Sequence, residues 1–167
     1  YMNPFPLNEA LHVSPWWQGE TSHPDFLRVS QAFLQAAGLD AEACHRLTAG
    51  HAYSLCNYLV GTPRFWNAYL PFVHNALALA ELNMPEALRQ KMHTADADWQ
   101  GMHHQATYVP FIVERLFPLF LDSEAGKGLT AMQLPCPLGE AGMDAALTAL
   151  REAKRMAVLE AAVRIFN

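Results

Sequence analysis

The stretch TPRFWNAYLPFVHNALALAEL, residues 62–82, contains the clearest helix start in the chain. Its first two residues combine a hydroxyl that can cap the free N–H groups of a helix with a proline at the first helical turn. Large apolar side chains then recur at three-to-four-residue spacing from Phe65 to Leu79. The stretch therefore predicts a helix from Thr62 to about Leu82, with a bend near Pro71.

Two further helices are predicted upstream of this stretch. Pro24 stands near the first position of one, whose apolar residues repeat until Gly38 supplies the stop. Asp40 is placed to cap a shorter helix through about Leu47. The run 51–60 suits either a short buried strand or a helical turn, because its period cannot be read over so few residues.

Three more helices are predicted downstream. Asn83 caps one that has Pro85 just inside its start, and Pro110 opens the most apolar one, residues 111–121. We expect Pro118 to interrupt this apolar helix. The last 24 residues are Ala-rich and free of Gly and Pro, so they predict the most regular helix of the chain.

The remaining segments lack a helical period. The first 24 residues hold four prolines and a pair of tryptophans, which predicts an irregular segment packed on the body. Residues 93–105 and 122–142 are expected to be loops, with one short strand at 129–134. The predicted fold class is therefore mainly α. An irregular Pro- and Trp-rich N-terminal segment precedes five to six helices, with at most one or two short strands, in a single domain of 167 residues.

Composition narrows the function classes. A hydrophobic content of 51% with 16% charged residues supports a packed core. The net charge of −5 and the scattered basic residues argue against a nucleic-acid partner. The longest apolar stretch, 108–121, is too short and too charged for a transmembrane segment. Three widely spaced cysteines favour reduced thiols, so we expect a soluble, cytoplasmic protein.

Paired indoles provide the first candidate site. Trp16 and Trp17 stand close to Glu20 and His23, and indoles beside such polar groups can form a sugar-stacking platform. These four residues are therefore candidate substrate-binding residues. The alternative is that both indoles pin the N-terminal segment to the body.

Acidic and histidine residues suggest a metal site. Asp96 and Asp98 form a D-x-D triplet, whose carboxylates can hold a divalent cation, Mn²⁺ or Mg²⁺, against a diphosphate. The alternative is a solvated acidic turn. A separate metal-dependent enzyme could use His93, His103 and His104 with Asp98, although no two histidines have the spacing of a helical metal site.

Glu114 and Arg115 lie inside the most apolar predicted helix. Charged side chains in an apolar helix require partners. We therefore expect that these two residues either form a structural ion pair or lie at the edge of a cleft. Arg115 is accordingly a candidate substrate-binding residue. Glu114, together with His104, is a candidate general base.

Three phrases together resemble the C-terminal part of certain bacterial glycosyltransferase-like proteins of surface-polysaccharide clusters. They are WQGE at 17–20 with His23-Pro24, CNYLV at 56–60 running into PRFW at 63–66, and PFIVERLF at 110–117. The resemblance covers residues 15–121. It implies sugar transfer from a nucleotide-sugar to a glycan acceptor, with the nucleotide-binding strands in another part of the protein. The chain begins with Tyr1 rather than Met, and we expect it to be a piece of a longer protein.

Two other function classes stay open from the sequence. One is a non-catalytic helical module that binds a partner protein, including a second copy of itself as a homodimer. The other is the metal-dependent helical enzyme with the His and Asp cluster.

Overall fold

The structure is a computed structural model that describes residues 12–48, 53–54, 56–95, 106–132, 134, 148 and 152–156. It confirms the mainly α fold class. Six α-helices run in chain order as α2 (Pro15–Ser22), α3 (Phe26–Ala36), α4 (Pro63–Asn83), α5 (Glu86–His93), α6 (Tyr108–Val113) and α7 (Leu116–Asp122). Two short 3₁₀ helices, η1 (Ala41–Cys44) and η3 (Glu124–Gly126), are also formed. Thr148 and residues 152–156 are also helical.

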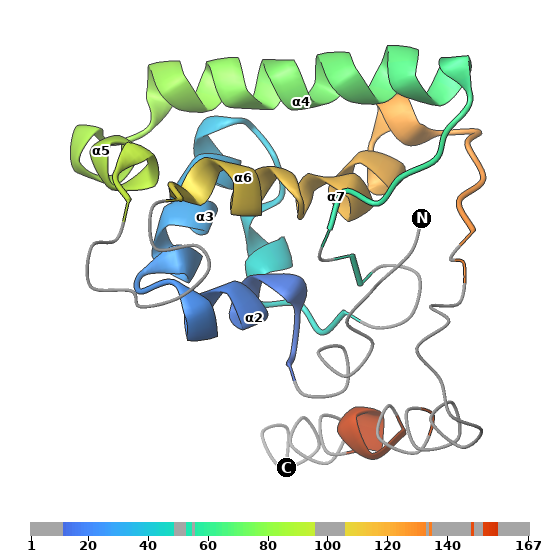
Figure 1. The fold of residues 1–167 in the computed structure, drawn as a ribbon, viewed down its shortest axis with the longest axis horizontal. Coiled ribbons are helices and arrows are strands. Elements are labelled where there is room, and N and C mark those ends of the chain that lie inside the picture. Colours follow the sequence, from blue (N-terminus) through green and yellow to red (C-terminus); the bar gives the residue numbers. More distant parts are fainter. Residues whose placement is uncertain are drawn as a thin grey trace.

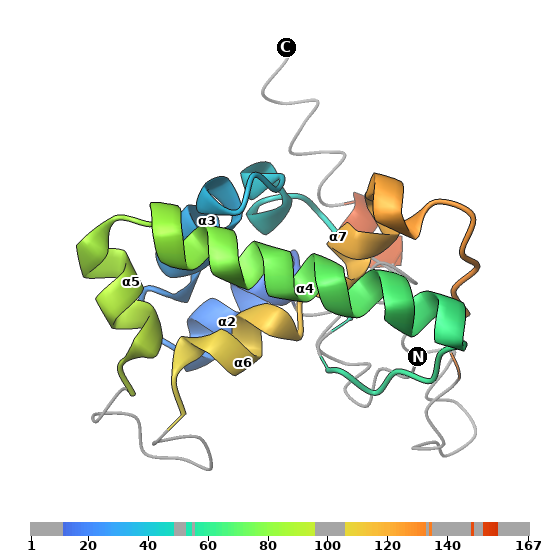
Figure 2. The ribbon, with the colours of Figure 1, turned by 90° about the horizontal axis from the view of Figure 1, so that it is seen from above.

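The long helix α4 spans the molecule above the shorter helices (Figure 1). Seen from above, α3 lies on one side of α4, and α2 and α6 lie on the other (Figure 2). Contacts join α3 to α2, α4, α5 and η1, whereas α7 contacts α4, α6 and η3. The short helices therefore form a layer under one long helix.

Aromatic side chains fill the contact between α4 and α7. The rings of Phe65 and Tyr69 stack with their centroids 5.2 Å apart. Phe120 meets both edge-on, at 5.8 Å from Phe65 and 5.1 Å from Tyr69. Such perpendicular pairs stabilise a core beyond the area that they bury. This aromatic cluster holds α7 in place beneath α4.

Three predicted helix boundaries are confirmed. The Thr62 hydroxyl accepts a hydrogen bond from the Phe65 N–H at 3.3 Å and caps α4. Asp40 caps η1 through the Glu42 N–H at 3.0 Å, although η1 ends at Cys44 rather than near Leu47. Gly38 ends α3 with φ of +69°, a left-handed conformation that suits glycine. Pro71 lies inside α4, which Figure 1 shows as one continuous helix.

The prediction that the whole N-terminal segment is irregular is wrong for residues 15–22. These residues form α2, with Pro15 at its first turn and the Ser14 hydroxyl accepting from the Trp17 N–H at 3.3 Å. The reason is that a proline at the first helical turn has no N–H to lose. Gly19 then allows α3 to approach, because a Cβ there would lie 2.3 Å from the Phe26 ring.

Two other prolines lie outside the helices that they were predicted to open. Pro24 precedes Asp25, the N-cap of α3, and Pro85 is itself the N-cap of α5. Asn83 is not a cap but the last residue of α4, and its side-chain amide donates to the Ala36 carbonyl at 3.2 Å.

The segments without a predicted helix are only partly described. Tyr53 and Ser54 are buried and have no regular secondary structure. Within 129–132 and at Leu134 the structure has no strand, only an isolated bridge residue at Leu134. Most of the predicted C-terminal helix, and residues 96–105, lie outside the described residues. None of the described helices combines the length and apolarity required to cross a membrane.

Candidate functional site

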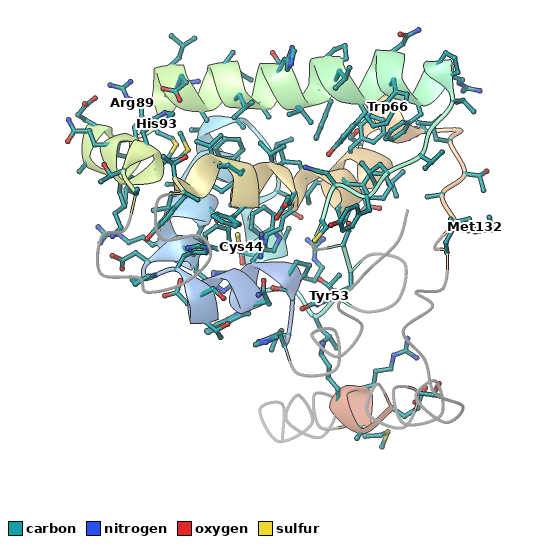
Figure 3. The ribbon with its side chains drawn as sticks, in the orientation of Figure 1. Cys44, Tyr53, Trp66, Arg89, His93 and Met132 are labelled. Carbon is teal, nitrogen blue, oxygen red and sulfur yellow. The ribbon has the colours of Figure 1, made fainter. Side chains whose placement is uncertain are left out.

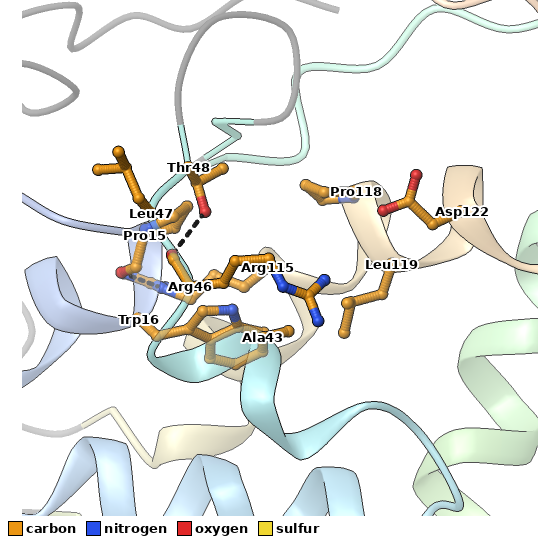
Figure 4. A pocket seen from close by; sticks show the side chains of 10 residues that line it. All are labelled: Pro15, Trp16, Ala43, Arg46, Leu47, Thr48, Arg115, Pro118, Leu119 and Asp122. Atoms are coloured by element: carbon orange, nitrogen blue, oxygen red, sulfur yellow. Dashed lines mark hydrogen bonds between the residues drawn. The ribbon is translucent and has the colours of Figure 1, made fainter. Parts of the chain in front are cut away.

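A cleft of about 190 Å³ opens between α2, the segment after η1, and α7 (Figure 4). Its lining residues come from α2, from η1 and the segment after it, and from α7 with its N-cap, and are Pro15, Trp16, Ala43, Arg46, Leu47, Thr48, Arg115, Pro118, Leu119 and Asp122. Pockets for drug-sized ligands usually measure about 300–1,000 Å³. This cleft therefore suits a smaller molecule, about the size of one sugar ring.

Arg115 reaches the cleft because the apolar helix breaks just before it. Pro118 has no N–H to donate to the Glu114 carbonyl, and its ring crowds that carbonyl. The helix consequently ends at Val113 and begins again at Leu116, so the break falls at Glu114 and Arg115, upstream of the interruption predicted at Pro118. Arg115 becomes the N-cap of α7.

The guanidinium of Arg115 ties α2 to this break. Its Nε donates to the Pro15 carbonyl at 2.8 Å, and its Nη2 donates to the Gln18 Oε1 at 2.6 Å. Its Nη1 donates to the Phe111 carbonyl at 2.6 Å, and the group lies 4.9 Å from the centre of the Phe26 ring. Only 4% of the residue is exposed, and burial lowers the pKa of Arg115 to about 10.

The cleft also carries polar groups that are more exposed than Arg115. Arg46 forms an ion pair with Asp40, and the hydrogen bond from Arg46 lowers the pKa of that carboxyl. The Thr48 hydroxyl donates to the Arg46 carbonyl at 3.2 Å. Asp122 ends α7 with an exposed carboxylate that has no hydrogen-bond or ion-pair partner among the described residues.

The two predicted indoles face different surroundings. Trp16 is 3% exposed, stacks near Phe26 with ring centroids 6.4 Å apart, and forms part of the cleft wall. Trp17 is 41% exposed and meets His45 edge-on at 6.4 Å. The structure therefore brings only Trp16 to the cleft.

Glu20 and His23 lie in the packing between α2, α3 and α6. Glu20 accepts a hydrogen bond from the Leu27 N–H at 2.7 Å, near the start of α3. His23 is buried, with its ring centroid 4.1 Å from that of Phe111. Neither residue lines the cleft, and their predicted contact with a glycan stays a prediction.

Glu114 is a neighbour of the cleft rather than a lining residue. Its Oε2 lies 4.0 Å from the Arg115 Nη1, which is within ion-pair range but longer than a hydrogen bond. Arg115 is thus held mainly by neutral acceptors rather than by the ion pair considered from the sequence.

The predicted metal ligands are mostly outside the described residues. These are Asp96, Asp98, His103 and His104, the last also a candidate base. His93 ends α5 and pairs with Glu81 of α4. Within the described part of the chain, no group of three or more His, Cys, Asp or Glu side chains could hold a metal ion.

A second hollow is mainly apolar and has no charged residue in its lining. This groove of about 330 Å³ is lined by Leu59, Val60, Gly61, Thr62, Phe65, Phe117, Leu121, Leu129, Thr130, Ala131, Met132 and Leu134. Val60 is 92% exposed and Met132 is 68% exposed, so apolar surface continues onto its rim. Figure 3 shows Met132 at the end of the molecule opposite His93.

Sequence reasoning missed three polar residues of the cleft, namely Arg46, Thr48 and Asp122. They are single residues without a motif, in segments that the pattern assigns to helix ends and loops. Only the contact between η1 and α2, and the position of α7, bring them to one place.

No protein-family model, curated protein or solved structure matches the chain.

Proposed function

We propose that this chain is the helical, acceptor-side part of a glycosyltransferase-like protein of bacterial polysaccharide biosynthesis, and that it binds a sugar in the cleft between α2 and α7. The observation that carries the proposal is the meeting of Trp16 and Arg115 in one cleft. Both were candidate substrate-binding residues from the sequence. They are far apart in the chain, at the start of α2 and before α7.

The cleft chemistry suits a hydroxyl-rich ligand. A carboxylate such as Asp122 accepts hydrogen bonds from sugar hydroxyls, and a guanidinium donates to them. The Thr48 hydroxyl can do both. Trp16 closes the wall of the cleft, and the half-buried Pro118 and Leu119 add apolar surface against which the C–H face of a sugar ring can pack. The transferred sugar would come from a nucleotide-sugar bound by another part of the protein.

Thermal unfolding in the presence of ligands tests this proposal. We expect monosaccharides at millimolar concentration to raise the unfolding temperature, because a ligand that binds only the folded state stabilises it. Nucleotide-sugars should be compared with and without Mn²⁺. Thr48→Val should reduce the stabilisation, because it removes a hydroxyl at nearly constant shape. Thr130→Val, in the apolar groove, is the matched control and should leave it unchanged.

The absence of stabilisation by every sugar tested would overturn sugar binding in this cleft. If Thr48→Val and Thr130→Val reduce the ligand-induced stabilisation equally, the sugar does not bind in this cleft.

A second candidate function is a helical interaction module that forms a homodimer, and the apolar groove favours it. An exposed apolar surface of this kind marks an interaction site in many proteins. The groove lining contains no charged residue, so two copies can meet across a twofold axis without repulsion between like charges.

Sedimentation measurements over a range of protein concentrations test the dimer. Val60→Asp and Met132→Asp should each shift the chain towards the monomer, because each places a charge in the contact. Leu82→Asp is the control, since Leu82 is also exposed but lies outside the groove lining. A chain that stays monomeric at all concentrations contradicts this second candidate.

A further inference from the structure

The lining of the cleft holds more cationic than anionic side chains. Two of its lining residues are arginines, Arg46 and Arg115, whereas Asp122 is the one carboxylate among the residues that line it. The carboxylates beside these arginines, Asp40 and Glu114, lie outside the lining. A cleft of this kind attracts anions.

Arg115 has unused capacity to donate hydrogen bonds. A guanidinium carries five N–H groups, and the described contacts of Arg115 take three of them. All three acceptors are neutral oxygens, and the nearest carboxylate oxygen, on Glu114, is 4.0 Å away. A buried cation without a hydrogen-bonded carboxylate is poorly compensated, and a bound anion would supply the missing charge.

Arg46 provides the second cation at the rim. Its side chain is 59% exposed and pairs with Asp40, which is not a lining residue. Exposed ion pairs contribute little to stability, so Arg46 can turn towards a ligand at small cost. Its planar fork matches the two oxygens of a carboxylate or phosphate.

Asp122 places an acceptor on the α7 side of the same cleft, away from Thr48 (Figure 4). A carboxylate repels an anionic group and accepts hydrogen bonds from hydroxyls. The ligand that satisfies both features has an anionic group near the arginines and hydroxyls near Asp122.

We infer that the ligand of this cleft is an anionic sugar, in which a carboxylate or phosphate group is held by Arg46 and Arg115. This inference rests on the proposed sugar-binding function and adds the charge of the substrate to it. The two anionic groups share the chemistry that the guanidiniums recognise, and the experiment distinguishes them.

Calorimetric titration with four probes tests the inference. The probes are glucose, glucuronic acid, glucose 6-phosphate and inorganic phosphate. We expect at least one anionic sugar to bind roughly tenfold more tightly than glucose, as one charge-assisted contact implies. The preference for carboxylate or phosphate follows from which of the two binds better. Added salt should weaken the binding of the anionic sugar and leave the binding of glucose unchanged.

Arg46→Gln is the deciding variant. It should lower the affinity for the anionic sugar roughly tenfold and change the affinity for glucose by no more than about twofold. Arg46→Lys should retain part of the preference for the anionic sugar. Arg155→Gln is the matched control, because Arg155 is a similarly exposed arginine in an ion pair with Glu152 and lies outside the cleft lining.

Each result has a separate meaning. Equal affinity for glucose and the anionic sugars, unaffected by Arg46→Gln, overturns the inference and leaves the sugar-binding function intact. Binding of inorganic phosphate as tight as that of glucose 6-phosphate overturns the sugar part and leaves an anion site. No binding of any probe contradicts both proposals.

Discussion

The Arg115 Nε donates a hydrogen bond to the Pro15 carbonyl at 2.8 Å, and this bond joins residues 100 positions apart in the chain. The same guanidinium bonds Gln18 of α2 and Phe111 of α6. One side chain therefore holds α2 against the break between α6 and α7, and at the same time lines the cleft.

Substitution of Arg115 should destabilise the fold. Arg115→Ala leaves three oxygen acceptors without their donor, and we expect the free energy of unfolding to fall by about 3 kcal/mol. Arg115→Lys should restore part of this loss, because the ammonium keeps the charge and some of the hydrogen bonds. The recovery should be incomplete, because an ammonium cannot reach all three acceptors that the planar guanidinium bonds. Urea denaturation measures both. The exposed control Arg155→Ala should stay within about 0.5 kcal/mol of the wild type. A similarly small effect of Arg115→Ala would contradict the structural role.

Local rules predicted most of the described helices, with α2 as the exception, and missed the contacts between them. Thr62 and Pro63 were sufficient to place the start of α4, and Ser14 and Pro15 carry the same signal for α2. The density of prolines around α2 obscured that signal. A proline inside an apolar run also acts one turn upstream, so the break appears at Glu114 rather than at Pro118.

The cleft was predictable only in part. The hydrophobicity of Trp16 and the isolation of Arg115 in an apolar helix both indicated residues with a special environment. Nothing local distinguishes Arg46, Thr48 or Asp122 from ordinary surface residues. Their importance depends on tertiary contacts, which no periodicity in the sequence reports.

Glu20 should behave as a helix cap. Its carboxylate accepts from the Leu27 N–H at 2.7 Å, whereas the N-cap residue Asp25 makes no side-chain capping bond. We expect Glu20→Ala to lower the free energy of unfolding by about 1 kcal/mol, and Glu20→Gln to cost less because its amide oxygen still accepts. Chemical denaturation measures both changes.

The result for Glu20 separates its two roles. Glu42→Ala is the control, because Glu42 is exposed and its side chain makes no hydrogen bond among the described residues. If Glu20→Ala keeps full stability but abolishes sugar binding, Glu20 contacts the glycan and is not a cap.

Stability should fall in alkali through Cys44. Burial raises the pKa of the Cys44 thiol to about 12, whereas a cysteine in an unfolded chain titrates near about 8.5. Between these values the unfolded chain has released a proton that the folded chain keeps, so rising pH favours unfolding. This group alone should lower the free energy of unfolding by about 2 kcal/mol from pH 8 to pH 10.

Urea denaturation across this pH range checks the prediction for Cys44. Cys44→Ala is less stable at pH 8 because it loses buried contacts, but it should lose about 2 kcal/mol less than the wild type on going to pH 10. The same loss in both proteins would show that the buried thiol does not cause the alkaline destabilisation.

Tyr69 offers a substitution that should not destabilise the core. Its hydroxyl is buried and has no hydrogen-bond partner among the described residues, while its ring packs between Phe65 and Phe120. Removing an unpaired buried hydroxyl relieves its desolvation cost, so Tyr69→Phe should raise the free energy of unfolding by up to about 1 kcal/mol. Tyr69→Ala should lower it by about 3–5 kcal/mol, because the ring is lost.

Thermal and urea unfolding of both Tyr69 variants test this account. Tyr58→Phe is the control, because that residue is 57% exposed and its change should stay within about 0.5 kcal/mol. A loss of more than about 1 kcal/mol in Tyr69→Phe would mean that the hydroxyl forms a stabilising hydrogen bond in solution. The aromatic cluster under α4 would then have a polar partner at its centre, and Tyr69 would hold α7 by that bond as well as by its ring.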